Sequence, residues 1–303
     1  MSTFKCLMIL SEKSSGSSAL QSELSKINGV NSIEWTQHCE RETLYWTKAA
    51  SVLRLPQVKL VDSEVPFPPD RARDQIMDLL SYNIPGFVPA PSDDKFFLFG
   101  GWRALCERYG PVFLEKSPHH LGQWSAIELI IEFIDLNPQI EFVLVGLVRN
   151  PLSVLYSQFR RWRTRPEKLQ DQWLMAYRNL KRLKGVLGQR LIVLTYEEMI
   201  TNPECIQPLL DFCRADEHAL SSWSFDARST SKWREDTSFG FMLSNEVVDL
   251  AMEFGYREDD LRNRRRLVWP AYREFACGIR SARTRLGEVK RMVKCQLVAP
   301  RVS

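Results

Sequence analysis

The sequence predicts an α/β fold, a three-layer sandwich in which helices cover both faces of a central parallel sheet. Short runs rich in β-branched and aromatic residues, typical of strands buried on both faces, recur along the 303 residues. Longer stretches with helical periodicity separate them, and such alternation gives right-handed crossovers between parallel strands. With 44% hydrophobic and 26% charged residues the chain has an ordinary globular composition, which excludes a disordered or fibrous protein.

Each expected element follows from its local pattern. The apolar runs predict strands at 4–10, 58–61, 96–99, 112–114, 142–148 and 191–194. Amphipathic periodicity predicts helices at 17–27, 39–54, 70–81, 123–135, 151–162, 167–187, 203–213 and 244–254. Six prolines between positions 66 and 91 predict that loops interrupt this region, which we interpret as an insertion and not as a domain boundary.

Several classes of protein are excluded by what the chain lacks. No apolar run approaches the ~20 residues that cross a bilayer, and the run at 4–10 is too short for a secretory signal, so we expect a cytoplasmic protein. The seven cysteines are scattered singly without metal-ligand spacing, and there are only four histidines. This pattern predicts reduced thiols and no metal site.

The charge is distributed unevenly along the chain. From Arg262 onward there are 12 Lys and Arg against 2 Asp and Glu, whereas the preceding residues carry 29 against 35. We expect residues 1–261 to form the α/β domain and 262–303 to form a basic, helical extension packed on it. The extension would touch an anionic surface, or it would simply be a solvated Arg-rich face. No pattern indicates specific binding of nucleic acid or an oligomeric state.

A first candidate anion site follows the strand at 4–10. A turn containing glycine opens the next helix, so several backbone N–H groups point into one concavity at the positive end of the helix dipole. Lys13 adds a full charge, and the serine hydroxyls add donors. The residues of the turn are Ser14, Ser15, Gly16, Ser17 and Ser18. The plainer alternative is a helix cap without a ligand.

A second candidate anion site follows the strand at 142–148. Arg149 ends the strand, Asn150 is suited to the N-cap of the next helix, and Pro151 fits its first position. Ser157 follows Arg149 by eight residues and would share an anion with its guanidinium. Ligands of open α/β sheets bind at this carboxyl edge. A structural ion pair for Arg149 is the alternative.

The two sites together resemble those of sulfotransferases that use 3′-phosphoadenosine 5′-phosphosulfate (PAPS), in the style of bacterial and carbohydrate-type members. Residues 15–18 resemble the family's Ser-Gly-Thr-Thr turn, a P-loop-like element that binds the 5′-phosphosulfate. Arg149 with Ser157 resembles its 3′-phosphate element. The resemblance covers residues 4 to about 235. It implies a sulfotransferase-like domain with PAPS as co-substrate, 3′,5′-adenosine bisphosphate (PAP) as product, and no metal.

Three further segments agree with this family. Glu115 and Lys116 match a Glu-Lys-Ser/Thr segment whose glutamate is the proposed base, and Tyr196 matches a tyrosine that contacts the adenine edge. Residues 228–233 lie where the family places a loop over the nucleotide. There Lys232 and Trp233 are the expected ligands.

Departures from the family pattern leave some roles open. Relatives usually place Lys or Arg immediately before Ser-Gly, whereas here Ser14 has that position, so either Lys13 or Lys116 would assist transfer. His119 and His120 follow Glu115 closely and compete with it as the base, because histidine already titrates near neutral pH. Ala19 replaces a stacking aromatic residue, so Trp233 or Tyr196 would supply any stacking on adenine.

The expected function is in-line transfer of a sulfuryl group from PAPS to a hydroxyl or amine of a small-molecule or carbohydrate acceptor. No local pattern names that acceptor, although four arginines between 160 and 165 hint at an anionic or sugar-like molecule. A P-loop kinase using ATP and magnesium is an alternative, but the Gly-Lys-Ser/Thr ending of its loop is absent. A third possibility is a non-catalytic nucleotide or polyanion binder.

Overall fold

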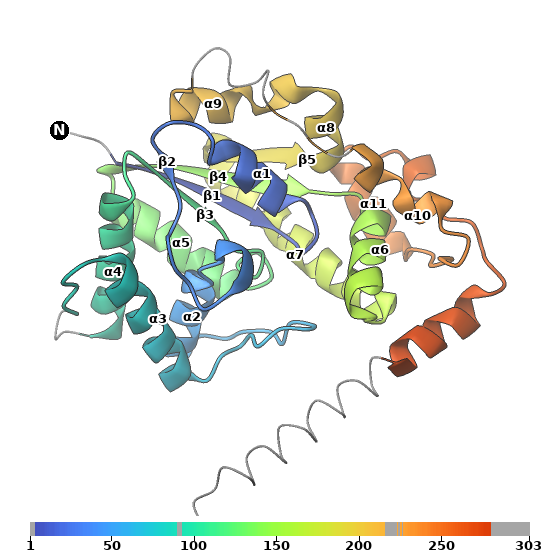
Figure 1. Ribbon diagram of the computed structural model, residues 1–303, viewed down its shortest axis with the longest axis horizontal. Helices are drawn as coiled ribbons and strands as arrows, with labels where there is room; N and C mark the ends of the chain where they lie inside the picture. The colour runs from blue at the N-terminus through green and yellow to red at the C-terminus, as the bar shows by residue number, and fades with distance from the viewer. Residues whose placement is uncertain (1–3, 90–92, 216–222, 224, 226, 280–303) are drawn as a thin grey trace, which may run out of the picture.

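A five-stranded parallel sheet forms the centre of the computed structural model, which describes residues 4–89, 93–215, 223, 225 and 227–279 (Figure 1). The strand order is β2-β3-β1-β4-β5. The strands are β1 (Phe4–Ser11), β2 (Val30–Asn31), β3 (Val112–Lys116), β4 (Ile140–Val148) and β5 (Leu191–Thr195). The predicted α/β class is therefore confirmed, and four of the six predicted strands are present.

Helices cover both faces of the sheet, as Figure 1 shows. Leu7 and Ile9 of β1 pack toward one layer, made of α1 (Ser17–Leu24), α8 (Tyr196–Thr201) and α9 (Gln207–Cys213). Cys6, Met8 and Leu10 pack toward the other, because successive side chains of a strand alternate between faces. That layer comprises α2 (Tyr45–Val52), α3 (Pro69–Asn83), α4 (Asp94–Arg108), α5 (Trp124–Leu136), α7 (Pro166–Leu187) and α11 (Asn245–Glu253).

A third apolar cluster lies beside the carboxyl edge of the sheet. It joins α6 (Pro151–Trp162), α10 (Lys232–Glu235) and residues 269–279, which are also helical. Trp269 is buried against Phe159 of α6, with ring centroids 5.2 Å apart. The described part of the basic extension thus contacts the α/β domain, whereas residues 280–303 lie outside the described part of the chain. Short 3₁₀ turns complete the chain at Cys39–Arg41, Gly188–Arg190, Pro203–Ile206, Ala227–Thr230 and Glu258–Leu261.

Two predicted strands are wrong. Residues 96–99 lie in α4, whose N-cap Asp93 accepts a hydrogen bond from the amide of Phe96. Residues 58–61 form a loop in which Val58 is half exposed. Apolar runs of four residues do not distinguish a strand from a helix or a covered loop, so the pattern was ambiguous at both places. Within the 66–91 region the helix predicted at 70–81 is present as α3, and Pro69 occupies its first position.

Among the described residues, no helix is long and apolar enough to cross a bilayer.

Lys48 of α2 is buried beneath the loops that contain Thr43 and Phe67. Its Nζ donates to the carbonyl of Thr43 at 3.1 Å and lies 5.8 Å from the centre of the Phe67 ring. Burial lowers its pKa to about 7. The unfolded chain keeps this proton up to the ordinary lysine pKa, so between pH 7 and that value unfolding takes up a proton and folding stability rises with pH.

We therefore expect the unfolding free energy to increase by about 1–2 kcal/mol from pH 7 to pH 9 because of this group. Urea denaturation at several pH values measures it. Lys48→Met, which keeps most of the side-chain volume, should abolish the increase and stabilise the protein at pH 7. The same pH profile in both proteins would contradict the prediction.

Candidate active site

The two predicted anion sites open into one cavity. β1 and β4 are neighbours in the sheet and run parallel, so the loops that follow them meet at the same edge. Both loops lead into helix N-termini, those of α1 and α6. The cavity between them measures about 550 Å³ and is lined by residues of both loops, including Ser14, Gly16, Ser17, Ser18, Arg149 and Ser157.

The turn at 14–18 is held tightly at the start of α1. Ser14 and Gly16 have positive φ angles of 64° and 92°, a conformation that favours glycine. A Cβ on Gly16 would lie 2.3 Å from the Tyr196 ring, so a side chain has no room there. The Ser15 hydroxyl points inward and shares a 2.9 Å hydrogen bond with the Tyr177 hydroxyl. Ser15 therefore anchors the turn, whereas its other four residues line the cavity.

Both candidate lysines lie beside this turn. Lys13 lines the cavity, and its Nζ donates to the main-chain oxygens of Val61 at 3.3 Å and Asp62 at 2.9 Å. Burial lowers the pKa of this ammonium group, against the opposing effect of neighbouring carboxylates. Lys116 is fully buried at the end of β3, and its Nζ donates to Ser18 Oγ at 3.2 Å. The structure thus brings two cations to the N-terminus of α1.

Arg149 joins two loops at the second predicted anion site. Its Nη1 donates to the Ser14 carbonyl at 2.8 Å and its Nη2 to the Ser229 carbonyl at 2.6 Å. Its guanidinium lies 4.6 Å from the centre of the Tyr196 ring, and its Nε is buried without a partner. Ser157 lines both the first cavity and an adjoining one of about 430 Å³, which Lys232 also lines.

The side chain of Asn150 fixes the start of α6. It accepts hydrogen bonds from the amides of Leu152 at 2.9 Å and Ser153 at 3.4 Å, as an N-cap does, and Pro151 occupies the first helical position.

Tyr196 and Trp233 are almost fully buried. Tyr196 is 4% exposed, between Gly16 and Arg149, and Trp233 is 2% exposed within the third apolar cluster. Neither lines the first or the second cavity, and Trp233 instead lines a separate cavity on the side of Glu197. Their predicted contact with adenine stays a prediction.

Of the three candidate bases, only His119 lines the cavity. Glu115 is 1% exposed, and its carboxylate accepts hydrogen bonds from Thr43 at 2.7 Å and from Ser117. Burial alone would raise the pKa of Glu115, but His120 and these hydroxyls hold it below its ordinary value. His120 is buried as well, with Nε2 3.6 Å from Glu115 and Nδ1 2.8 Å from the Thr47 hydroxyl.

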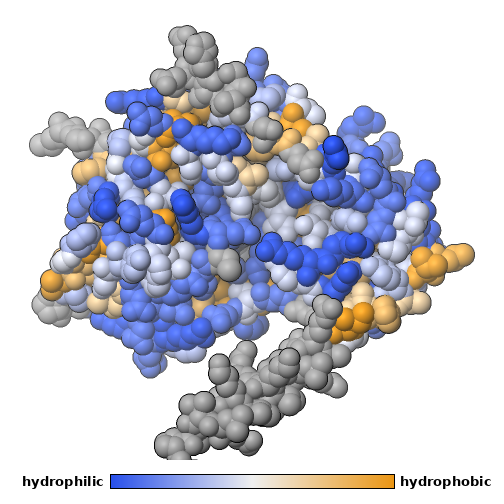
Figure 2. Space-filling model, viewed as in Figure 1, coloured by the Kyte–Doolittle hydropathy of each residue, from blue (hydrophilic) through white to orange (hydrophobic). Residues whose placement is uncertain are grey.

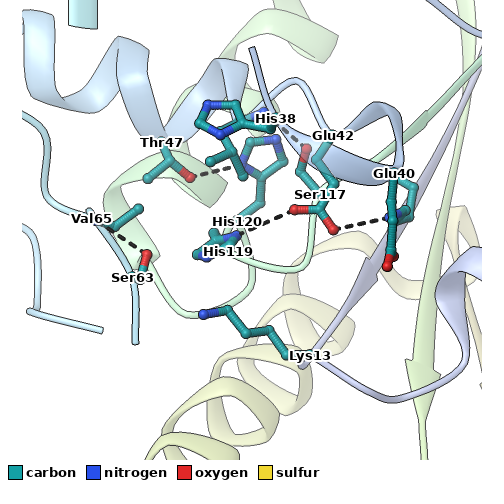
Figure 3. A network of polar contacts seen from close by, with 12 residues as sticks. Lys13, His38, Glu40, Glu42, Thr47, Ser63, Val65, Ser117, His119 and His120 are labelled. Atoms are coloured by element: carbon teal, nitrogen blue, oxygen red, sulfur yellow. Dashed lines mark hydrogen bonds and ion pairs between the residues drawn. The ribbon is translucent and has the colours of Figure 1, made fainter. Parts of the chain in front are cut away.

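His119 faces the polar side chains of the cavity, as Figure 3 shows. Its Nδ1 lies 3.8 Å from Glu42 Oε2 and makes no hydrogen bond. Burial lowers the pKa of His119 well below its ordinary value, and the charges of Lys13 and Lys116 add to this. The ring is therefore neutral at pH 7 and able to accept a proton.

The sequence analysis missed the segment that covers this edge of the sheet. His38, Glu40 and Glu42 line the cavity together with Asp62 and Trp162. Burial raises the pKa of Glu42, although its Oε1 lies 3.0 Å from Lys116 Nζ. No motif marks His38, Glu40 and Glu42, because the segment before α2 reaches the site only through contacts with distant parts of the chain. Among the described residues, no three His, Cys, Asp or Glu side chains are grouped as metal ligands.

Two sulfotransferase domains are among the solved structures that resemble this chain. The sulfotransferase domain from the Synechococcus PCC 7002 olefin synthase aligns with a TM-score of 0.55 at 17% identity, covering 84% of this chain and 95% of that chain. The sulfotransferase domain from the curacin biosynthetic pathway aligns with a TM-score of 0.50 at 17% identity, covering 84% and 98%. No protein-family model and no curated protein matches the sequence. The chain therefore has a sulfotransferase-like fold.

Proposed function

We propose that this protein is a PAPS-dependent sulfotransferase that transfers a sulfuryl group to a hydroxyl or amine of a small-molecule or carbohydrate acceptor. The observation that carries the proposal is that residues of both predicted anion sites line one cavity. The turn at 14–18 and the Arg149–Ser157 pair line the same 550 Å³ space, as a nucleotide with two separate phosphate groups requires. The sulfotransferase-like fold supports the same conclusion.

The residues of the cavity fit PAPS. Ser17 and Ser18 at the N-terminus of α1 would hold the 5′-phosphosulfate, since a helix N-terminus favours an anion. Ser157 and Lys232 would hold the 3′-phosphate in the adjoining cavity. The unpartnered, buried Nε of Arg149 offers a further donor, while its two Nη atoms keep the two loops in place.

In the proposed reaction, each group of the cavity has one role. The acceptor oxygen or nitrogen forms a bond to sulfur while the bond from sulfur to the 5′-phosphate oxygen breaks, and PAP leaves. His119 takes the acceptor's proton, because it is neutral and lines the cavity. The amides at the start of α1, with Lys13 and Lys116, stabilise the charge that develops on the leaving oxygen.

Thermal denaturation with different nucleotides tests this function. We expect PAP to raise the melting temperature in the presence of EDTA, because a ligand that binds only the folded state stabilises it. ATP with magnesium should have a smaller effect. Stabilisation by ATP with magnesium alone would favour the kinase, and stabilisation by heparin but by neither nucleotide would favour a polyanion binder.

The variant Ser157→Ala tests whether this residue contacts the nucleotide. Loss of one hydrogen bond to a phosphate should weaken PAP binding about five- to ten-fold, as measured by isothermal titration calorimetry. Ser81→Ala, on the exposed surface of α3, is the matched control and should bind PAP like the wild type. Equal affinities in both variants would remove Ser157 from the nucleotide site.

A further inference from the structure

The Glu40 carboxylate lies against the same donors that would receive the sulfuryl end of the nucleotide. Its Oε2 accepts a 2.6 Å hydrogen bond from Ser18 Oγ and lies 3.7 Å from Lys116 Nζ. Its Oε1 lies 3.7 Å from an Nη1 of Arg161. A hydroxyl, an ammonium and a guanidinium from α1, β3 and α6 thus converge on one carboxylate. Such a donor set binds oxyanions in general, whether carboxylate, sulfate or phosphate.

Glu40 is held in place by these contacts and yet remains displaceable. The Ser18 hydroxyl, Lys116 and Arg161 lower the pKa of Glu40 against a smaller effect of burial, so it is ionised at pH 7. Its side chain is 45% exposed and faces the cavity. Glu40 and Arg41 both have positive φ angles, 59° and 55°, an unfavourable conformation for two consecutive residues with side chains. The backbone conformation at Glu40 and Arg41 is therefore unfavourable by itself, and the contacts of the Glu40 carboxylate stabilise it.

Glu42 differs from Glu40 in its exposure and in its contacts. It is 16% exposed, its Oε1 lies 3.0 Å from Lys116, and its Oε2 is near His119. No hydrogen bond joins it to Ser18, so it would stay in place when an anion reaches the turn. Of the two carboxylates, only Glu40 stands where an incoming oxyanion would bind.

We propose that Glu40 is an internal competitor of the nucleotide. Its carboxylate occupies the oxyanion position at Ser18 in the free protein and leaves when the phosphosulfate enters. Lys116 and Arg161, released from Glu40, then bind the incoming oxyanion. The identity of the ligand rests on the proposed function, whereas the competition itself requires only a tetrahedral oxyanion.

Calorimetric titration without acceptor tests this competition. Glu40→Gln should bind PAPS roughly three- to ten-fold more tightly than the wild type, a modest factor because the ion pairs are partly exposed. The gain should be smaller for PAP, which lacks the sulfuryl group, and absent for 3′-AMP, which has no 5′ group. Inorganic sulfate, as the simplest probe, should also bind more tightly to the variant.

Glu64→Gln is the matched control. Glu64 lines the same cavity, but its carboxylate pairs with Arg71 at 2.9 Å and not with Ser18. Its removal should change PAPS affinity less than about two-fold, as expected for a screened charge. Equal gains in both variants would reduce the effect to the net charge of the cavity and overturn the proposal.

Two other results separate the possible failures. Unchanged PAPS affinity in Glu40→Gln with a raised acceptor KM would make Glu40 an acceptor ligand and overturn the competition. Failure of PAPS and PAP to bind either protein, with tighter inorganic sulfate in Glu40→Gln, would instead support the competition and refute the PAPS-dependent function.

Discussion

Replacing His119 by asparagine is expected to lower kcat about 10²- to 10⁴-fold, the usual contribution of a general base. The substitution keeps a polar side chain of similar reach but removes the group that we propose as the acceptor of the proton. PAP affinity should change little, because we assign the phosphates to the start of α1 and to Ser157 and Lys232, and not to His119. Initial rates with labelled PAPS, together with calorimetric PAP binding, separate the two effects.

Glu115→Gln is the comparison for this prediction. Glu115 does not line the cavity, and Thr43, Ser117 and His120 surround its carboxylate. We expect a smaller loss of kcat than in His119→Asn, through displacement of the loop that carries His119. A larger loss in Glu115→Gln, with near-normal turnover in His119→Asn, would return the role of base to the glutamate.

The pH dependence of kcat gives an independent readout. Since burial lowers the pKa of His119, its ring stays neutral below the ordinary histidine pKa, and protonation at still lower pH removes the base. The acid limb of kcat should therefore lie below pH 6.5. An acid limb above that value would contradict the proposed role of His119 as the base.

The sequence was informative where one local pattern determines one local structure. Gly16 between serines and Asn150-Pro151 after an apolar strand each specify a helix start, and the structure shows both at the predicted places. The parallel sheet then brings them together without further information, because β1 and β4 are neighbours. The fold and the placement of the two loops could be predicted for this reason.

The rest of the site depends on contacts between distant segments. Glu40 and Glu42 reach Ser18 and Lys116 from loops that carry no motif, over separations of 22 and 74 residues. The choice between Glu115 and His119 depends on which side chain faces the cavity, and neighbouring positions in the sequence do not reveal that. The strand prediction at 96–99 was wrong for a related reason, because α4 forms through its Asp93 cap and its packing against the sheet.

Gly16→Ala is expected to destabilise the protein by about 2–4 kcal/mol and to abolish measurable PAP binding. The new methyl group would meet the Tyr196 ring at 2.3 Å in a backbone conformation, φ 92°, that disfavours any side chain. The ring cannot move away easily, because Arg149 lies against it. Relief of the clash would therefore shift the 14–18 turn or the Arg149 side chain, and both belong to the proposed nucleotide site.

Gly86→Ala separates the clash with Tyr196 from the effect of a positive φ angle. Gly86 also has a positive φ, 71°, but a Cβ there would meet nothing within 4 Å. Its substitution should cost only about 1 kcal/mol in urea denaturation and leave PAP binding intact. If Gly16→Ala folds too poorly to study, adding Tyr196→Ala makes room for the methyl group and should recover part of the lost stability. Equal losses in the two glycine variants, without any recovery in the double variant, would show that the turn is not confined by Tyr196.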